Sequence, residues 1–514
     1  MPTEDAAHQI KSILIVGGGT AGWLTATILA SRFHKPDGSG LAIRLVEAPD
    51  IPIIGVGEGT WPGMRSTLRN AGIKEADFLR ACQASFKQGS KFVGWCSGEQ
   101  NDFYYHPFDL PAAFSELNIA QIWVNGDQAT SFSELSCAQE PLCEQHLSPK
   151  LMSTREYAGA TNYGYHLDAG MFSQFLREHC TKRLGVDLVL DRVTKVHSAE
   201  NGDVDSVETE TSGVLNADLF IDCTGFRSLL LGEHYNVPFI DQAHVLPINS
   251  AIAVQVPYKA DEAIKSATVS TAQSAGWIWD IGLMNRRGVG HVYSAAHTSQ
   301  DQAHFELQCF LGTDETTYAD LNPRSLSIRP GYRAKSWEKN CLAIGLSAGF
   351  LEPLEASAMM LIETSANLLA DLLPQSGKDM DRVSATFNQK FQYRWERIVD
   401  FLKLHYVLSR RTDPFWRDSA NHATISDRLK DDLERWERRA PETTSFEHET
   451  EVFPSASYQY VLYGMGFETR TTDKTESDLE QRIAHAATER VRRDVDLLSS
   501  KLVPNRKILD LISA

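Results

Sequence analysis

Short apolar runs that end at glycines recur in the N-terminal part of the chain and predict buried strands. Residues 13–16 are aliphatic and lead into the glycine-rich segment 17–22, which is followed by a helix-like stretch to about residue 33. A second apolar run, at 43–46, ends at Glu47. The order of strand, glycine turn, helix and strand predicts a βαβ unit.

After these first elements, the composition and the hydrophobic pattern of the chain change twice. Apolar runs at 217–222 and 342–345 are also closed by turn residues and belong with the first strands. The segments 90–160 and 230–335 are rich in Tyr, Trp and Phe and predict a substrate-facing lobe. Beyond about Asp379 the pattern becomes helical and charged.

Near the C-terminus, apolar residues recur every three or four positions from Leu479 to Leu498 and predict an amphipathic helix that packs on the body of the protein. Thr475 and Asp478 have the spacing of a capping box, which would start this helix.

The glycine-rich segment predicts a dinucleotide site. Gly17, Gly19 and Gly22 form the pattern G-x-G-x-x-G between a predicted strand and a predicted helix. The first glycine permits a tight turn, the second lets a pyrophosphate approach the backbone, and the third allows close packing of helix on strand. Glu47 ends the second strand 25 residues after Gly22, where a ribose ligand is expected, the alternative being a solvated strand end.

The composition of the chain excludes some classes of partner and site. The 514 residues include 50 Lys and Arg against 67 Asp and Glu, a formal charge of −17, which argues against nucleic acid and anionic membranes as partners. The eight cysteines form no C-x-x-C pair and are expected to be reduced thiols, and no metal site is expected. With no run of about 18 apolar residues and a polar N-terminus, the chain is expected to be cytoplasmic.

Several motifs, taken in order, resemble the flavin-dependent tryptophan halogenase family. The matching stretches are residues 17–23, 54–62, 84–92, 276–281, 345–355 and 413–416. The resemblance implies an α/β (α+β) fold, in which an FAD-binding Rossmann-like module of the flavin monooxygenase type carries a mainly helical substrate lobe.

This resemblance suggests a division of the chain into six parts. They are an N-terminal FAD-binding βαβ part (1–90), a substrate-lobe insertion (91–160), an FAD-binding continuation (161–230), a sheet and substrate region with a tryptophan motif (231–335), a segment for the FAD and halide sites (336–380) and a helical C-terminal substrate lobe (381–514).

The implied activity is halogenation of an electron-rich aromatic such as indole or tryptophan. Reduced FAD, supplied as FADH2 by a separate NAD(P)H-dependent flavin reductase, and O2 would oxidise chloride or bromide to hypohalous acid. The acid would travel to a separate aromatic site. The family often forms homodimers.

The family's catalytic lysine falls on Lys87, where a buried ammonium can orient or capture the electrophile, and Lys91 is a nearby decoy. Its assisting carboxylate falls on Glu355, which could accept a proton from the substituted ring or could instead cap or salt-bridge a helix. Trp277 and Trp279 match a motif that would keep the organic substrate away from the flavin, and core packing would account for them equally well.

Further positions follow from the same resemblance. Substrate contacts are expected from His106, Phe108 and Tyr458, and backbone amides of Ser357 and Ala358 are expected to help hold halide. The expected cofactor-binding residues are Gly17, Gly19, Thr20, Ala21, Gly22, Glu47, Glu58, Gly59, Val196, Gly225, Gly345 and Leu346.

The chain departs from the family's pattern at three places. Gly282 follows the tryptophan motif where proline is usual, and Ala356 and Ala358 replace the Ser and Gly of the turn after Pro353, which puts halide affinity or preference in doubt. Gln459 stands beside Tyr458 where enzymes acting on free tryptophan tend to carry a second tyrosine. Indole or a phenol is therefore a rival to tryptophan as the substrate.

Three other functions compete with halogenation. Gly345-x-Ser347-x-Gly349 satisfies a hydrolase nucleophile-elbow pattern, but Gly349 and Pro353 disfavour the helix that must follow the serine. An FAD-dependent aromatic monooxygenase would hydroxylate its substrate without Lys87. A non-catalytic flavin-binding protein would bind FAD and form no product.

Overall fold

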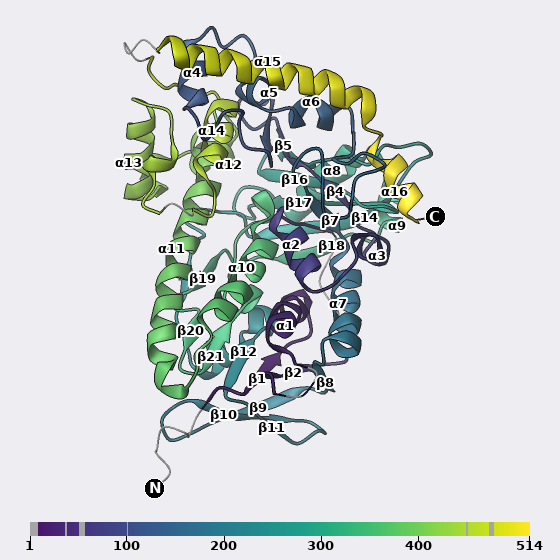
Figure 1. The fold of residues 1–514 in the computed structure, drawn as a ribbon, viewed down its shortest axis with the longest axis vertical. Helices are drawn as coiled ribbons and strands as arrows, with labels where there is room; N and C mark the ends of the chain where they lie inside the picture. Colours follow the sequence, from purple (N-terminus) through teal and green to yellow (C-terminus); the bar gives the residue numbers. More distant parts are fainter. Residues whose placement is uncertain are drawn as a thin grey trace. The chain divides into compact units, whose positions relative to one another are not determined.

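The computed structural model describes residues 9–35, 37, 39–50, 57–99, 101–448, 451–471 and 477–513. The chain forms two compact units that alternate along the sequence (Figure 1). The first unit combines the described residues up to Cys82 with Leu167–Gln242 and Arg329–Trp395, and the second combines Gln83–His166 and Ala243–Ile328 with the described residues from Glu396 onward. The six-part division by function stays a prediction.

The first unit is built on a mixed sheet whose core strands are parallel. In sheet order its strands are β20 (Trp337–Glu338), β21 (Cys341–Ala343), β12 (Leu219–Asp222), β1 (Ser12–Val16), β2 (Ala42–Glu47) and β8 (Asp187–Leu190). Only β20 runs antiparallel to its neighbour. The strands β1, β12 and β21 are almost wholly buried, as expected for aliphatic runs in a parallel sheet covered by helices.

Helices cover this sheet. Within the first unit, α1 packs against α7 and α10 (Figure 1). The helices of this unit are α1 (Thr20–Phe33), α2 (Gly63–Asn70), α3 (Glu75–Ala81), α7 (Ala169–Arg183) and α10 (Ser357–Leu372), and α11 (Met380–Val407) runs on from this unit into the second. The expected strand, glycine turn, helix and strand are therefore confirmed as β1, α1 and β2.

Two small antiparallel sheets complete the first unit. One comprises β9 (Val193–Ser198), β10 (Val204–Thr209) and β11 (Val214–Asn216), and the other β13 (Phe239–Asp241), β19 (Gly331–Arg333) and β22 (Gly349–Phe350). The short strand β3 (Glu58–Gly59) also belongs to this unit.

The second unit contains a larger sheet with an antiparallel centre. In order its strands are β18 (Arg324–Ser327), β14 (Ser250–Pro257), β17 (Arg286–Tyr293), β16 (Gly276–Gly282), β15 (Thr268–Gln273), β5 (Gly89–Val93) and β6 (Phe103–Pro107). Residues far apart in the sequence meet here, because β15 pairs in parallel with β5. The strand β4 (Ser85–Lys87) pairs separately with β7 (Gly164–Leu167).

Helices gather around this second sheet. They are α4 (Ile119–Asn125), α5 (Phe132–Ser136), α6 (Gln139–Glu144), α8 (Gln300–Leu311), α9 (Glu315–Asp320), α12 (Pro414–Ser419), α13 (Asp427–Trp436), α14 (Ser455–Gly464), α15 (Asp478–Lys501) and α16 (Asn505–Ser513). The mixed α/β class predicted from the sequence is thus confirmed, with helices dominating the C-terminal part.

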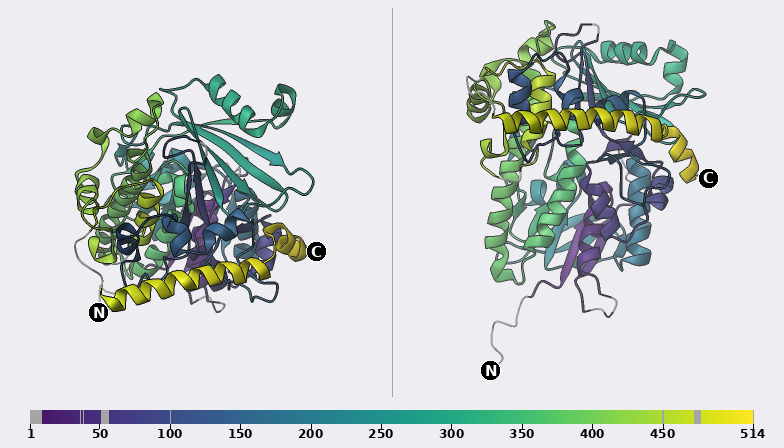
Figure 2. Two further views of the ribbon diagram at one scale, coloured as in Figure 1. Left: turned by 90° about the horizontal axis from the view of Figure 1, so that it is seen from above. Right: turned by 45° about the horizontal axis from the view of Figure 1, so that its top comes forward.

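The predicted C-terminal amphipathic helix is α15, which contacts α5 and α6 and forms one unbroken rod in both views of Figure 2. Its capping box consists of Ser477 and Glu480, whose side chains accept from each other's backbone N–H groups. The proposed cap Thr475 lies outside the described residues. The helix begins at Asp478, with Ser477 as its N-cap.

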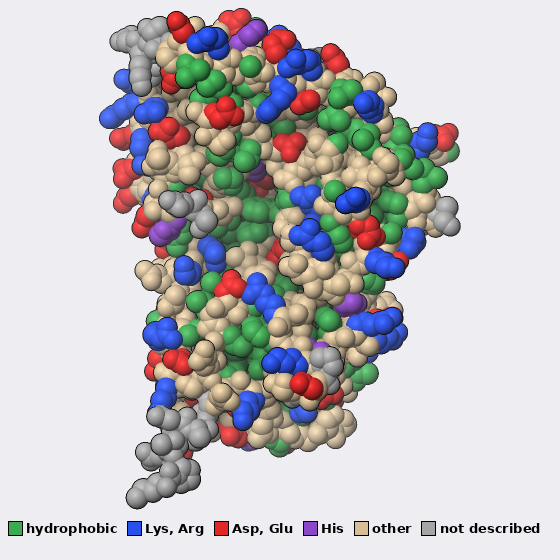
Figure 3. Space-filling view, in the orientation of Figure 1, with side chains coloured by type: hydrophobic (Ala, Val, Ile, Leu, Met, Phe, Trp, Pro, Cys, Tyr) green, Lys and Arg blue, Asp and Glu red, His purple; other side chains and the backbone are tan. Residues whose placement is uncertain are grey.

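The surface carries charges of both signs. On the face drawn in Figure 3, acidic and basic side chains are interspersed. Among the described helices, none is both long and apolar enough to cross a membrane. All eight cysteines fall in the described parts of the chain and are free thiols, as predicted.

The first prediction concerns the tryptophan strand β16. Trp279 lies directly opposite Gly290 of β17, and a Cβ atom at Gly290 would lie 2.2 Å from the Trp279 ring and 2.6 Å from the Ile252 carbonyl oxygen. Gly290→Ala should therefore lower the free energy of unfolding by about 1–3 kcal/mol, measured by urea denaturation. Gly126→Ala, where the nearest atom lies at 3.3 Å, is the matched control. Equal stability of the two variants would contradict this packing.

Candidate active site

The glycine turn between β1 and α1 has the geometry of a phosphate cradle. Gly17 has φ +114°, and a Cβ there would lie 2.3 Å from the Cys223 carbonyl oxygen. A Cβ at Gly22 would lie 1.9 Å from the Gly17 carbonyl oxygen, whereas Gly19 has nothing within 4 Å of that position. Helix α1 starts at Thr20 with no side-chain cap. Open backbone in front of an uncapped helix N-terminus suits a pyrophosphate, so these residues fit a dinucleotide.

Glu47 lies at the end of β2, beside this turn. Its carboxylate accepts a hydrogen bond from Trp23 Nε1 at 3.3 Å and forms an ion pair with Arg177 at 3.5 Å. Burial raises the pKa of Glu47, although Arg177 and Trp23 act in the opposite direction. A polar, half-buried carboxylate here is suited to a ribose hydroxyl, and this role stays a prediction.

Two further predicted cofactor turns are tied to the first. Gly225 and Gly345 both adopt left-handed backbone, with φ of +71° and +73°. Ser347 Oγ donates to the Gly225 carbonyl at 3.2 Å, which links the two turns, and a Cβ at Gly345 would lie 2.7 Å from the Ala21 side chain. The structure therefore brings Ala21, Gly225 and Gly345, with the adjoining Leu346, to one place.

Asp222 organises one of these turns and was not singled out in the sequence. It is fully buried at the end of β12, and its carboxylate accepts backbone N–H bonds from Thr224 at 3.0 Å, Leu230 at 2.8 Å and Leu231 at 2.9 Å. Backbone donors of this kind satisfy the hydrogen-bonding capacity of a buried carboxylate. The sequence does contain a signal for this role, because Asp222 is an acidic residue at the end of an otherwise apolar strand, shortly before Thr224 and Gly225.

The remaining predicted cofactor residues lie outside the linked glycine turns. Gly59 is buried in β3, and burial raises the pKa of the neighbouring Glu58 to about 7. Val196 lies in β9 opposite Val207, and its side chain packs against the hydrophobic cluster that contains Leu14 and Val46. Cofactor contacts from Glu58 and Val196 stay predictions.

Lys87 is the most unusual of the predicted residues. Its side chain is only 1% exposed, on β4, where it lies opposite Gly164. The Lys87 ammonium is 5.3 Å from the centre of the Phe108 ring, so two predicted site residues meet within the second unit. By contrast, Lys91 is partly exposed and pairs with Glu144 at 2.5 Å. Lysine side chains are seldom fully buried, and the face of the Phe108 ring attracts the Lys87 ammonium.

His166 shares the face of Lys87 and was not predicted from the sequence. His166 lies on β7, opposite Ser85 of β4. It is the diagonal cross-strand neighbour of Lys87 on the same face of the two strands. Its Nε2 is 2.8 Å from Thr268 Oγ1. Burial, and then the nearby Lys87 ammonium, lower the pKa of His166 well below its ordinary value, so this imidazole is neutral near neutral pH.

His106 lies in an aromatic cluster on the sheet. Its Nε2 is 2.9 Å from Ser457 Oγ on α14, and its ring centre is 5.9 Å from that of Phe401 and 6.2 Å from that of Tyr460. Such a cluster supplies the flat apolar surface that an aromatic ligand needs.

Tyr458 is engaged within the protein. Its hydroxyl accepts from Arg397 Nη2 at 2.9 Å, and Arg397 also contacts the carboxylates of Asp432 at 3.2 Å and Glu451 at 3.6 Å. The side chains of these charged residues are at most 5% exposed. Burial raises the pKa of Tyr458. The neighbouring Gln459 is also buried and donates to the Pro441 carbonyl at 2.7 Å.

Trp277 and Trp279 are both buried in β16. The ring of Trp277 lies 6.0 Å from Trp95, which in turn contacts Trp416 at 5.1 Å. The ring of Trp279 covers Gly290. Packing in the second unit accounts for both residues, and their role as a barrier stays a prediction.

Glu355 begins an unusual turn before α10. Its side chain is 6% exposed, and both Glu355 (φ 63°) and Ala356 (φ 54°) adopt left-handed backbone. Ser357 and Ala358 are the first residues of α10, and Ala356 provides no side-chain cap. The N–H groups of a first helical turn have no partner within the helix and suit an anion, and the halide role of Ser357 and Ala358 stays a prediction.

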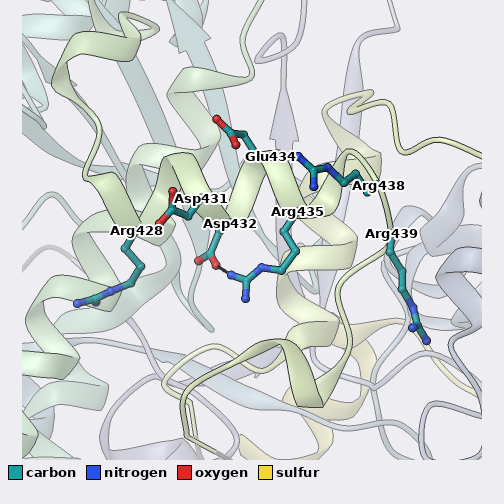
Figure 4. Close-up of a pocket in the computed structure, with 7 residues that line it drawn as sticks. All are labelled: Arg428, Asp431, Asp432, Glu434, Arg435, Arg438 and Arg439. Atoms are coloured by element: carbon teal, nitrogen blue, oxygen red, sulfur yellow. Dashed lines mark hydrogen bonds and ion pairs between the residues drawn. The ribbon is translucent and has the colours of Figure 1, made fainter.

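A separate pocket on α13 is unsuited to an aromatic molecule. It has a volume of about 730 Å³ and is lined by Arg428, Asp431, Asp432, Glu434, Arg435, Arg438 and Arg439 (Figure 4). Arg435 pairs with Asp432, and Arg439 pairs with Glu442. Sites for aromatic ligands are mainly apolar, so this charged pocket is a surface feature.

Comparison with known proteins gives one consistent result. The family model for tryptophan halogenases matches residues 12–481. The chain is 33% identical to the tryptophan 6-halogenase ThaL of Streptomyces albogriseolus, over 93% of this chain and 94% of that protein. The crystal structure of a tryptophan halogenase from Shewanella frigidimarina has 47% identity and a TM-score of 0.96, with 98% of each chain covered. BrvH, a flavin-dependent halogenase from Brevundimonas sp., has 33% identity and a TM-score of 0.86, covering 98% of this chain and 99% of that one.

The glycine turn yields a prediction that separates folding from cofactor binding. Gly22→Ala should lower the unfolding temperature, because its Cβ would overlap the Gly17 carbonyl. Gly19→Ala should fold normally, because the space at that position is open, and should weaken FAD binding at least about tenfold by crowding the pyrophosphate. Thermal unfolding and quenching of flavin fluorescence measure the two effects. Unchanged FAD affinity in Gly19→Ala would contradict the placement of the pyrophosphate.

Glu363 provides a pH-dependent prediction. It is buried on α10, where it accepts a hydrogen bond from Thr67, and burial raises its pKa to about 7. Because the folded state retains the proton to higher pH than the unfolded chain, the stability contribution is complete below about pH 4.5 and is lost as the pH rises through about 7.

Glu363→Gln mimics the protonated acid. It should match the wild type in stability near pH 5 and exceed it by about 2–3 kcal/mol at pH 8, as measured by urea denaturation. Glu200→Gln, at an exposed position of the same unit, should show no such divergence. A pH-independent difference for Glu363→Gln would contradict the raised pKa.

Proposed function

The protein belongs to the tryptophan halogenase family, and we propose that it is an FADH2-dependent halogenase that uses O2 and chloride or bromide to halogenate an electron-rich aromatic substrate. The observation that carries this proposal is the Lys87 ammonium, which is buried in β4 and lies over the Phe108 ring. A flavin hydroxylase has no use for such a lysine.

The first unit would hold the cofactor. When bound, reduced FAD supplies the reaction with O2 that oxidises halide to hypohalous acid. Gly17, Gly19 and the N-terminus of α1 would bind the pyrophosphate, and Glu47 would bind the ribose. The linked turns at Gly225 and Gly345 would bind the rest of the cofactor.

Lys87 would deliver the electrophile. Its Nζ can donate a hydrogen bond to the oxygen of hypohalous acid. Alternatively, its neutral amine can react with the acid to give a haloamine, in which an N–halogen bond replaces an N–H bond while the oxygen–halogen bond breaks and water leaves. Both roles benefit from exclusion of water, because bulk water would compete for the hydrogen bond and hydrolyse the reagent. Gly164 leaves the position opposite Lys87 without a side chain, and the neutral His166 adds no second positive charge.

Glu355 and the start of α10 would complete the chemistry. The Glu355 carboxylate can take the proton that the aromatic ring loses after substitution, which restores aromaticity. The N–H groups of Ser357 and Ala358 would hold the halide ion. Replacement of the family's Ser and Gly by Ala356 and Ala358 leaves these backbone donors in place.

The substrate is proposed to be indole-like, without an amino-acid end. The cluster around His106 and Phe401 suits a planar ring. Arg397 donates to the Tyr458 hydroxyl, and the Gln459 amide nitrogen donates to the Pro441 carbonyl, so these two donors, which could otherwise bind a substrate's carboxylate, are engaged within the protein. Release of either one would leave a buried polar partner unsatisfied, which is costly.

We propose two partners in addition to the substrate. A separate NAD(P)H-dependent reductase would supply FADH2. A homodimer is also proposed, on the behaviour of the family.

Substitution of Lys87 tests the function. Lys87→Ala should lower the rate of halogenation at least about hundredfold, because the electrophile loses its positioning group. FAD affinity should be unchanged. The assay supplies FAD, a generic flavin reductase, NADH, bromide and a panel of indole, tryptophan and phenols, and mass spectrometry detects the bromine isotope pattern. Lys91→Ala, which removes a partly exposed lysine with its own aromatic neighbours, should retain activity.

The same assay separates the alternatives. A hydroxylated product without halogen, unaffected by Lys87→Ala, would establish a monooxygenase. Equal activity in Lys87→Ala and the wild type would refute the role of Lys87. Preference for tryptophan over indole would overturn the proposed substrate class.

A further inference from the structure

Two consecutive residues before α10 adopt left-handed backbone although neither is glycine. Glu355 has φ 63° and ψ 11°, and Ala356 has φ 54° and ψ 37°. For residues with a Cβ atom this conformation is sterically unfavourable, and it persists only where surrounding contacts hold it. The turn therefore needs an external restraint.

The peptide unit that joins these two residues is held at both ends. Its carbonyl, that of Glu355, accepts a hydrogen bond from Trp61 Nε1 at 2.8 Å. Its N–H group, that of Ala356, donates to the Pro353 carbonyl at 3.1 Å. The second of these bonds is local, whereas Trp61 is 294 positions away in the sequence, on the segment between β3 and α2. Both residues belong to the first unit.

Fixing this peptide plane has consequences in two directions. On one side it sets the direction in which the Glu355 side chain leaves the backbone. On the other side it sets the orientation of the first turn of α10, including the N–H groups of Ser357 and Ala358. Because a peptide unit is planar and rigid, one hydrogen bond to its carbonyl restrains both.

We propose that Trp61 is a positioning residue that holds this left-handed turn, and through it the Glu355 carboxylate and the halide-binding amides, in their working orientation. The part that concerns halide and Glu355 rests on the proposed function. The restraint on the backbone stands apart from it.

Ala356 supplies a specific test of this inference. Glycine adopts left-handed backbone without steric cost, so Ala356→Gly should make the turn less dependent on Trp61. If Trp61 acts through the backbone, Ala356→Gly should rescue Trp61→Phe, which removes the N–H group. If Trp61 acted only by filling space, no rescue would follow.

Trp337 is a matched control in the same unit. Its Nε1 donates to the Lys339 carbonyl at 2.9 Å, and Lys339 is likewise a left-handed residue, with φ 54°. Trp337 lies on β20 and is almost fully buried, and no predicted site residue lies on the turn at Lys339. Trp337→Phe therefore removes an equivalent bond at a position without a proposed role in the reaction.

The experiment combines hydrogen exchange with halide kinetics on the full-length protein. In Trp61→Phe, amide exchange in a peptide spanning 353–360 should become about five- to tenfold faster, the loss expected for one hydrogen bond. The KM for bromide should rise by a similar factor, with FAD affinity unchanged. Trp61→Phe combined with Ala356→Gly should return both quantities towards wild type, and Trp337→Phe should change neither.

Two outcomes would overturn the inference. One is unchanged exchange and unchanged bromide KM in Trp61→Phe. The other is an effect that Ala356→Gly fails to reverse. If Trp61→Phe does not fold, Trp61→benzothienylalanine keeps the bicyclic ring, removes only the N–H, and is measured in the same way. If no variant halogenates anything, the proposed function fails, and the exchange comparison still decides whether Trp61 holds the turn.

Discussion

At the carboxyl end of β1, the glycine turn packs closely against the Cys223 carbonyl that follows β12 and against the turn that begins at Gly345. The Cβ positions of Gly17 and Gly22 are filled by carbonyl oxygens, and that of Gly345 lies against Ala21. This close approach lets the turns that follow β1, β12 and β21 converge on a single point. The predicted cofactor residues of the first unit are arranged around it, and Asp222 holds one of the converging turns through buried N–H bonds.

Two buried cations of the second unit, Arg397 and Lys87, have different surroundings. Arg397 is surrounded by carboxylates and by the Tyr458 hydroxyl, so its charge is compensated and its role is structural. Lys87 instead lies over an aromatic ring, beside an imidazole that its own charge helps to keep neutral. An ammonium in such surroundings is suited to act on a reagent, whereas the Arg397 cluster is suited to hold helices together.

The start of α10 shows how a departure from the family's pattern can be compensated. Ala356 occupies a left-handed position where a substitution for the usual serine removes a polar side chain. The indole of Trp61 restrains the adjoining carbonyl from outside the turn. Backbone N–H groups do not depend on the side chains of their residues, so replacement of the Ser and Gly expected from the family's pattern leaves the N–H groups of the first turn of α10 in place.

The βαβ unit, the glycine turn and the family could all be predicted from the amino-acid sequence. Each of these depends on local order: apolar runs closed by glycines, and motifs in a fixed succession. The order of motifs also singled out Lys87 as a buried lysine, but it did not give its neighbours, because Gly164 and Phe108 come from other parts of the chain. Tertiary structure alone decided the partners. It placed His166 beside Lys87, engaged Tyr458 with Arg397, and joined Trp61 to Glu355 across 294 positions. The partners of a side chain depend on which strands and helices pack together, and a local sequence pattern does not contain that information.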